Sequence, residues 1–514
     1  MVDWQQEIKR TTGFIRILFS AKMSVLGLII LVVFGFLSIA APIVTPYNPQ
    51  HDIVAGVYAP PAWYRYFNEG QLLSQNQVLE TQPGLPSDPI QSGWQFSSSD
   101  PHLSASFDPN TSNSPGSGSM KLTVDRSNGP LIGNFTATFR KSFEWPYKGP
   151  PSKFTGSLVM KTPDATPSEP IYATVFIERL GTDAHKWTIT DVTPTNSSAD
   201  IFNKSWTNYP LTTNAWQTPI SLDSLDPSVR GVLNVVDLDP SVLIFSSQDQ
   251  YSYGVTVTFT SNSASSTPLN VYLDDMNLKL YGTSWGLLGT DAYGYDIWSQ
   301  LIYGARISLA VGLLAAFIGI ALGLLVGLMA GYMGKVVDET LMRFTDMLLV
   351  IPGLPLLIVL VAVIGNSLGP GRLFALILII GFLGWMGFAR VVRAQVLSLK
   401  ERPFVEAARA AGAGAGHIAT RHIIPNIVGL IYVNLALAVP SAILSEAALS
   451  FLGLGDVTVL SWGRMLNLVQ ENGAQRIWWW VIPPGLAIAL VSLSFVMIGF
   501  SLDTIFNPRL RQRR

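Results

Sequence analysis

One polar, glycine-rich segment lies between two apolar runs of membrane-helix length, and its residue types raise the question of its function. It reads EAARAAGAGAGHIATRHIIPN, residues 406–426, with a single carboxylate, Glu406, at its head. Alanine and glutamate favour helix over 404–411, and Gly412 weakens it. A second short helix is expected over 417–424. A connection this long is uncommon without a function, so we expect a helix, a glycine turn and a helix on the cytoplasmic face.

The composition excludes several kinds of chemistry. The 514 residues include no cysteine, which removes disulfides, thiolate metal sites and cysteine nucleophiles. Gly334-Lys335 is followed by Val336, so this chain has no phosphate-binding loop of the GK[ST] type and no ATPase activity is expected in it. The net charge of −1 gives no general attraction to nucleic acid. With 48% hydrophobic and 13% charged residues, an integral membrane protein with a soluble part is expected.

Six apolar runs predict an all-α membrane domain with six transmembrane helices. They cover residues 25–44, 307–331, 344–365, 373–391, 427–452 and 479–502. The first run is longer than a signal-peptide core of roughly 7–15 residues, so we expect it to be a retained helix. The chain divides into a tail with the first helix (1–48), a polar insert (49–285) and a mostly apolar core (286–514) that holds five of the spans and a loop at 400–426.

Basic residues in the short loops predict the orientation. Lys and Arg precede the first span, lie between the second and third and between the fourth and fifth, and close the chain. With six spans, all four groups fall on one side, which is then cytoplasmic. Both termini are therefore expected in the cytoplasm, and residues 49–285 outside the cell, in a multi-pass protein of the cell membrane surrounded by lipid.

Small residues repeat every four positions along the second span, at Gly319, Gly323, Gly327 and Gly331. They share one helix face and let another backbone approach closely. That backbone could belong to this chain, which we favour, or to a partner subunit. Glu446 is the one carboxylate well inside an apolar run, and a structural role near a helix end is favoured over proton coupling.

The insert is predicted to be an all-β, jelly-roll-like sandwich, because alternating runs are separated by turn residues and no long helical pattern is present. The expected strands are 121–124, 136–143, 171–180, 187–192, 231–236, 253–260 and 271–280. The last run resembles the closing strand of jelly-roll carbohydrate-binding modules, where an aspartate pair occurs.

Candidate sites in the insert are weaker. Asp274 and Asp275 either bind a cation or end a strand, and no metal is specified. Five tryptophans, each more often a core residue than a sugar platform, are Trp94, Trp145, Trp187, Trp206 and Trp216. Trp187, with the aspartate pair, forms the candidate sugar or cation site. N-x-[ST] sequons, consistent with an outside-facing domain, begin at Asn110, Asn134, Asn196 and Asn203.

The loop at 400–426 resembles the EAA loop of ABC importer permeases. The matching pattern is Glu406-Ala407-Ala408, then Gly412, then His422-Ile423-Ile424-Pro425. In that family the loop is the coupling helix that docks on the ATPase subunit. The resemblance implies that Glu406, with Ala407 and Ala408, faces an ATPase, that Gly412 makes the turn between two short helices and that Pro425 ends the segment.

Further motifs place the resemblance in the dipeptide, oligopeptide and nickel branch. GTDAYGYD at 289–296 is similar to its G-T-D-x-x-G-R-D segment, with Tyr295 where arginine is usual, and SEAALSFLGLG at 445–455 also fits. The resemblance covers about 1–50 and 286–514. It implies a second related permease, two ATPase subunits that hold ATP and Mg, and an extracellular solute-binding protein. No cofactor is expected in this chain.

The predicted function is thus the transmembrane subunit of an ATP-driven importer of dipeptides or oligopeptides. The sugar-module-like insert keeps an oligosaccharide importer of the same family open. A membrane-anchored surface receptor or adhesion protein is the alternative from another class, and six helices with an EAA-like loop argue against it.

Overall fold

The chain folds into two compact units, which we describe separately. A computed structural model describes residues 22–79, 88–90, 92–115, 117–129, 131–166, 169–181, 185–188, 216, 220–233, 239–262, 266–365 and 371–506. The helical unit consists of Met1–Asp52 and Ile297–Arg514, and the β unit is Ile53–Asp296. The first helix and the C-terminal half of the chain therefore form one unit, and the segment between them forms the other.

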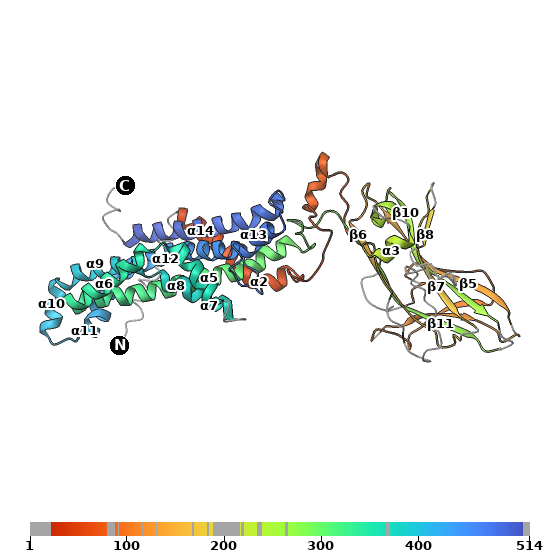
Figure 1. Ribbon diagram of the computed structural model, residues 1–514, viewed down its shortest axis with the longest axis horizontal. Coiled ribbons are helices and arrows are strands. Elements are labelled where there is room, and N and C mark those ends of the chain that lie inside the picture. The colour runs from red at the N-terminus through yellow and green to blue at the C-terminus, as the bar shows by residue number, and fades with distance from the viewer. Residues whose placement is uncertain are drawn as a thin grey trace. The chain divides into compact units, whose positions relative to one another are not determined.

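Long apolar helices dominate the helical unit and run alongside one another (Figure 1). They are α2 (Lys22–Val44), α5 (Ile297–Met333), α12 (Ile424–Phe451) and α14 (Trp478–Phe506). At 37 residues, α5 is about 55 Å long and exceeds a hydrocarbon core of about 30 Å. The predicted span at 307–331 is thus the C-terminal part of a longer helix, which begins ten residues earlier.

Two of the predicted spans are interrupted. The third consists of α6 (Lys335–Val350) and α7 (Gly353–Gly365), which differ in direction by 89°. Pro352 lies between them, and proline cannot continue the backbone hydrogen-bond ladder. The fourth consists of α8 (Arg372–Leu383) and α9 (Met386–Lys400), with Gly384 between them. The described residues contain five helices long and apolar enough to cross a membrane, or six if the bent pair is one span.

Two antiparallel sheets make up the β unit. The first has the strand order β3-β4-β11-β6-β9, with β1 also paired to β11, and the second has the order β2-β5-β10-β7-β8. The strands are β1 (Gln77–Val78), β2 (Trp94–Ser98), β3 (Leu103–Asp108), β4 (Ser119–Val124), β5 (Gly133–Trp145), β6 (Lys153–Lys161), β7 (Ile171–Arg179), β8 (His185–Thr188), β9 (Ile220–Asp223), β10 (Asp249–Ser261) and β11 (Leu269–Tyr281).

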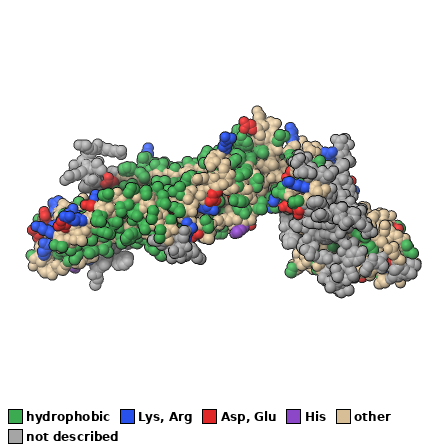
Figure 2. All heavy atoms as spheres, in the orientation of Figure 1, with side chains coloured by type: hydrophobic (Ala, Val, Ile, Leu, Met, Phe, Trp, Pro, Cys, Tyr) green, Lys and Arg blue, Asp and Glu red, His purple; other side chains and the backbone are tan. Residues whose placement is uncertain are grey.

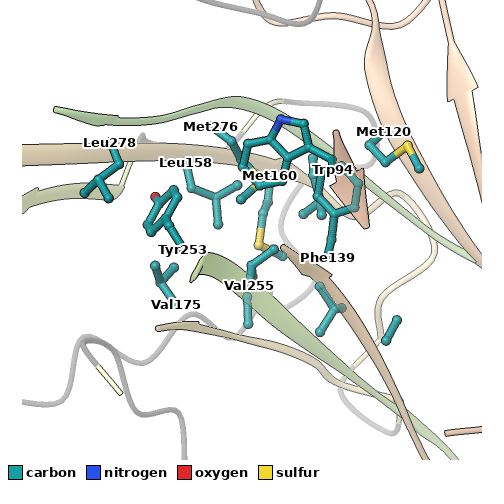
Figure 3. Packing of buried hydrophobic residues seen from close by; sticks show 14 of the residues in the cluster. Trp94, Met120, Phe139, Leu158, Met160, Val175, Tyr253, Val255, Met276 and Leu278 are labelled. Atoms are coloured by element: carbon teal, nitrogen blue, oxygen red, sulfur yellow. The ribbon is translucent and has the colours of Figure 1, made fainter. Parts of the chain in front are cut away.

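One hydrophobic core joins the two sheets. Figure 3 shows Leu158 and Met160 of β6 pointing toward Tyr253 and Val255 of β10 in the other sheet. Trp94 is 2% exposed and stacks on Phe139 with ring centroids 4.8 Å apart. Alternation of buried and half-buried residues along parts of these strands produces this inward face.

The predicted β-rich insert is confirmed, and one predicted strand is wrong. The strands expected at 121–124, 136–143, 171–180, 253–260 and 271–280 lie within β4, β5, β7, β10 and β11 or extend one residue past them. The strand expected at 231–236 begins instead in α3 (Pro227–Val232). Pro227 opens that helix, where its missing N–H has no cost, and alternation over six residues could not reveal this.

Candidate functional site

The polar loop at 400–426 folds into two short helices at one end of the helical unit. Helix α10 spans Pro403–Ala410 and α11 spans Ala415–Ile418, and a π-helical turn, Ala419–Ile423, leads into α12. Gly412 between them has φ +84°, a left-handed conformation that favours glycine. The predicted helix, glycine turn and helix are confirmed.

Three apolar side chains fasten this loop to the spans. Val405, Ile418 and Ile423 are each 0% exposed. They belong to a hydrophobic cluster with residues of α9, among them Val392 and Val396. The sequence analysis did not identify these three residues as buried. Apolar β-branched residues in an otherwise polar loop could have indicated it. The loop is therefore a rigid projection of the helix bundle.

The opposite face of the loop is open. Glu406, Ala407, Gly412 and Pro425 are exposed, and Ala408 is half-buried. In the described part of the chain, no ion pair involves Glu406. Figure 2 shows Lys, Arg and acidic side chains gathered at this end of the unit, beyond the hydrophobic surface of the helices. We call the exposed residues Glu406, Ala407, Gly412 and Pro425 the coupling surface, whereas Ala408, the remaining predicted residue, packs against the buried cluster.

Polar contacts tie the loop region to three helices. Asp338 of α6 and Arg393 of α9 form a two-point ion pair, with 2.6 Å between Oδ2 and Nη2. Lys400 donates to the Gly331 carbonyl at the end of α5 over 3.4 Å. These pairings join residues far apart in sequence and were not expected. The first contact joins α6 to α9, and the second joins the end of α9, where the loop begins, to α5.

The repeated glycines of α5 lie against α8 and α9 of the same chain. A Cβ added at Gly323 would lie 2.8 Å from the Trp385 carbonyl oxygen, and one at Gly327 would lie 2.6 Å from that of Ala389. At Gly331 it would meet Val396 at 2.7 Å, and at Gly319 the Gly381 carbonyl oxygen at 3.2 Å. The spacing left open whether the glycines face this chain or a partner subunit. These contacts place them against α8 and α9 of this chain.

A cavity of about 230 Å³ lies where the bent pair meets its neighbours. Its lining includes Gly319 of α5, Ile351 at the bend, Met386 of α9, and Ser441 and Ser445 of α12. Ligand pockets usually measure about 300–1,000 Å³, so this one is small for a peptide. Broken helices beside a cavity are a common feature of transport proteins.

A second polar cluster lies at the far end of α12. Glu446 is 2% exposed, and its Oε1 accepts hydrogen bonds from Ser450 Oγ at 2.7 Å and from Ser461 Oγ at 2.6 Å. Ser461 is the N-cap of α13 (Trp462–Glu471), where its Oγ accepts from the Arg464 N–H at 3.1 Å. This carboxyl therefore bridges two helices.

The aspartate pair of the β unit lies at a bulge in the middle of β11. Asp275 has φ +51°, and the register shifts between Asp274 and Asn277. Asp274 Oδ2 accepts from the Asn113 N–H at 2.7 Å, and Asp275 Oδ2 from Asn113 Nδ2 at 2.6 Å. Burial raises the pKa of Asp274, and this effect exceeds the opposite effect of the hydrogen bonds donated by the N–H groups of Asn113 and Asp275. The pair pins a loop that is distant in sequence, and the expectation that it ends a strand is wrong.

The other candidates in the β unit are scattered. Trp94 and Trp145 are core residues, 2% and 0% exposed, so neither is a sugar platform. Asn110 and Asn134 are exposed. The side chain of Trp187, and Trp206, Asn196 and Asn203, lie outside the described residues. No group of three or more metal-ligating side chains occurs in the described ranges.

The GTDAYGYD segment holds the chain that follows the first helix. Thr290 Oγ1 donates to the Gly56 carbonyl at 2.6 Å and accepts from the Ala59 N–H at 2.8 Å. Asp291 Oδ1 accepts from the Tyr295 N–H at 3.0 Å, and burial raises the pKa of the Tyr295 phenol. Tyr295, in place of the expected arginine, stacks on Tyr293. The segment has a positioning role within the β unit.

A bundle of apolar helices long enough to cross a membrane, with an exposed and well-anchored loop at one end, is typical of a multi-pass membrane protein. The comparisons with known proteins agree. The model described as "Binding-protein-dependent transport system inner membrane component" matches residues 323–512. The model "N-terminal TM domain of oligopeptide transport permease C" matches residues 11–61.

Individual relatives are similar over the same share of the chain. The dipeptide transport system permease protein DppC of Bacillus subtilis is 37% identical over 241 residues, 47% of this chain and 73% of its own. The oligopeptide transport system permease protein OppC of Haemophilus influenzae is 39% identical over 225 residues, 43% of this chain and 70% of its own. A solved structure of carbohydrate-binding modules from the β-sandwich superfamily covers 36% of this chain and 56% of its own, with 15% identity and a TM-score of 0.22, too low to establish a shared fold.

The chain belongs to the family of binding-protein-dependent transport system inner membrane components. Within it, the chain is an ABC importer permease of the C-type branch, as the motifs at 289–296 and 406–426 had indicated. Neither family model covers residues 62–322, which include most of the β unit.

Proposed function

We propose that this chain is the C-type permease subunit of an ATP-driven importer of dipeptides or oligopeptides. The observation that carries the proposal is the coupling surface: an exposed glutamate on a short helix whose other face is anchored by Val405, Ile418 and Ile423. A rigid projection of this kind can pass the motion of an ATPase to the spans. Peptide cargo follows from the relatives, which are named as dipeptide and oligopeptide permeases.

The complex would contain a second related permease, two ATPase subunits that bind ATP and Mg, and an extracellular solute-binding protein. This permease would line half of a shared path, and the bent pair α6–α7 with its cavity would be part of that half. Counting the bent pair as one span gives six. The coupling surface and both termini are then cytoplasmic, with lipid around the spans.

The bounds of the β unit, Ile53–Asp296, are close to those of the predicted insert, 49–285. We propose that this unit lies outside the cell. We propose a jelly-roll-like sandwich, supported by the two antiparallel sheets with one core. Exposed Asn110 and Asn134 are available for glycosylation, and Asn196 and Asn203 would be the other acceptors. An oligosaccharide importer is less well supported, because Trp94 and Trp145 are buried. No metal is assigned to Asp274 and Asp275.

The test is ATP hydrolysis by the purified complex with its binding protein, against a panel of short peptides and oligosaccharides. We expect stimulation by peptides. Stimulation by oligosaccharides alone would show that the cargo is an oligosaccharide and not a peptide. Purification of this chain without an ATPase subunit would favour a surface receptor.

Glu406→Lys tests the coupling surface directly. Reversal of this exposed charge should weaken ATPase docking and lower stimulated hydrolysis and uptake by roughly tenfold, the equivalent of about 1.4 kcal/mol. Glu144→Lys makes the same charge change at an exposed position of β5 and should leave both unchanged. Normal assembly and transport by Glu406→Lys would remove the proposed role of Glu406.

A further inference from the structure

The far end of α12 is joined to α13 by few polar contacts, and Glu446 supplies the only carboxylate among them in the described residues. Its Oε1 accepts from Ser461 Oγ at 2.6 Å. Next to it, the Trp462 N–H donates to Ser308 Oγ of α5 at 3.1 Å, and Trp462 Nε1 donates to the Leu301 carbonyl at 2.9 Å. The first turn of α13 is thus fastened to both α5 and α12.

The packing around this turn leaves no spare space. A Cβ added at Gly463 would lie 2.6 Å from Ala447 Cα of α12, and one at Gly304 would lie 3.1 Å from Trp462 Cδ1. Trp462 is 0% exposed. Because the backbones already touch, α13 fits this seat in one position, and any relative movement of α5 and α12 must displace it.

Packing of α13 against α12 does not by itself require a carboxyl group at Glu446. Its second oxygen, Oε2, is buried and accepts no hydrogen bond of normal geometry in the described part of the chain, although the Ser308 hydroxyl of α5 also lies near the carboxyl. A buried polar atom without a partner is unfavourable, so a residue that served stability alone would be better replaced by an apolar one. The closed seat therefore keeps a polar group that packing alone does not require.

Helix α12 connects this seat to the coupling surface. It begins at Ile424, directly after the docking loop, and its 28 residues extend about 42 Å to Phe451. Glu446 lies one and a half turns before its end. Motion applied at the loop is delivered by one helix to the Glu446–Ser461 contact.

We propose that Glu446 is a positioning residue of the transport cycle: through Ser461 it holds α13 closed against α5 and α12, and this contact opens when the end opposite the coupling surface opens to admit substrate. The inference rests on the proposed function. Two hydroxyl bonds on one oxygen suit a contact that is made and broken in each cycle, whereas a buried charge pair would be harder to separate.

The experiment compares variants of the assembled complex for ATP hydrolysis without binding protein and for peptide transported per ATP. Glu446→Ala and Ser461→Ala should each release α13, raise hydrolysis in the absence of binding protein by roughly tenfold and lower transport per ATP. Glu446→Gln keeps an acceptor oxygen for Ser461 and should restore most of the coupling. Ser494→Ala, which removes a buried hydroxyl bonded within α14, should behave as the wild type.

The outcomes separate the two proposals. If the wild-type complex shows no peptide-stimulated hydrolysis, the proposed function fails before any variant is compared. If the wild type is stimulated but the variants lose hydrolysis and transport in parallel, at an unchanged ratio, Glu446 is only structural and the inference is overturned. Should Glu446→Ala not assemble, Ser461→Ala decides by the same ratio.

Discussion

The two units of this chain pack with side chains of different size: small residues in the helical unit and large ones in the β unit. In the helical unit, α5 meets α8 and α9 through glycines, because the backbones approach within contact distance. In the β unit, the sheets are held apart by large side chains, among them Trp94, Trp145 and Tyr253, all buried. Lipid tails are as apolar as leucine, so membrane helices gain little from bulky apolar contacts and much from close approach. In water, burying bulky apolar area is the main driving force.

Similarity to known families also differs between the two units. Both family models fall on 11–61 and 323–512, and neither covers most of the β unit. The family assignment therefore rests on the helical unit and the first residues of the β unit. The comparison also predicts opposite sensitivities: the β unit should not tolerate loss of volume, and the helical unit should not tolerate its gain.

The largest effect is expected from Trp94→Ala. Removing a stacked, buried indole should lower the free energy of unfolding of the β unit by about 3–5 kcal/mol. Amide hydrogen exchange in β2, β5 and β10 should accelerate, while exchange in α5 and α12 stays unchanged. The control is Ile132→Ala, at a side chain 75% exposed, which should shift stability by no more than about 0.5 kcal/mol. Equal acceleration in the helices would mean that the two units do not unfold separately.

Gly327→Leu should produce the reverse pattern. Any Cβ there falls 2.6 Å from a backbone oxygen of α9, so α5 and α9 must separate, at about 1–3 kcal/mol. We expect a lower thermal midpoint of the detergent-purified complex and faster exchange in α9, with the β unit unchanged. Gly485→Ala is the matched control, because a Cβ at that α14 glycine meets nothing within 4 Å. An undisturbed Gly327→Leu protein would contradict the close packing of α5 on α9.

The smallest effect concerns pH and belongs to the β unit alone. Burial raises the pKa of Asp274 above its unfolded value of about 3.9. The folded state then binds the proton more tightly, so this group's contribution to stability falls as pH rises from about 4 through the raised pKa. Asp274→Asn should remove that part of the pH dependence, measured by chemical denaturation between pH 4 and 7. Identical slopes for wild type and variant would show that Asp274 is not the group responsible.

Several parts of the fold could be predicted because their signals are local. Apolar runs indicated the spans, alternation indicated β4, β5, β7, β10 and β11, and Gly412 indicated the turn between α10 and α11. The bend of 89° between α6 and α7 was not predicted, although Pro352 was visible, because proline in a span is compatible with a kink, a break or a straight helix.

The candidate site was predictable only on its exposed side. Glu406 and Gly412 were found from their spacing, whereas the anchors Val405, Ile418 and Ile423 required knowledge of what α9 presents to them. In the β unit, burial of Trp94 and Trp145 depended on which strand faces meet. Their sequence neighbourhoods do not distinguish a core tryptophan from a binding platform.

The sequence by itself determined the class of protein, the helices with their glycine faces and the helix–turn–helix loop at 400–426, because hydropathy, residue size and backbone preference act over a few neighbouring residues. Only the tertiary structure decided that the glycines of α5 face α8 and α9, that Asp274 holds Asn113, 161 residues away, and that Glu446 meets Ser461 of α13. Each of these contacts depends on two surfaces being brought together by the packing of whole helices and sheets, and no local preference encodes which surfaces those are.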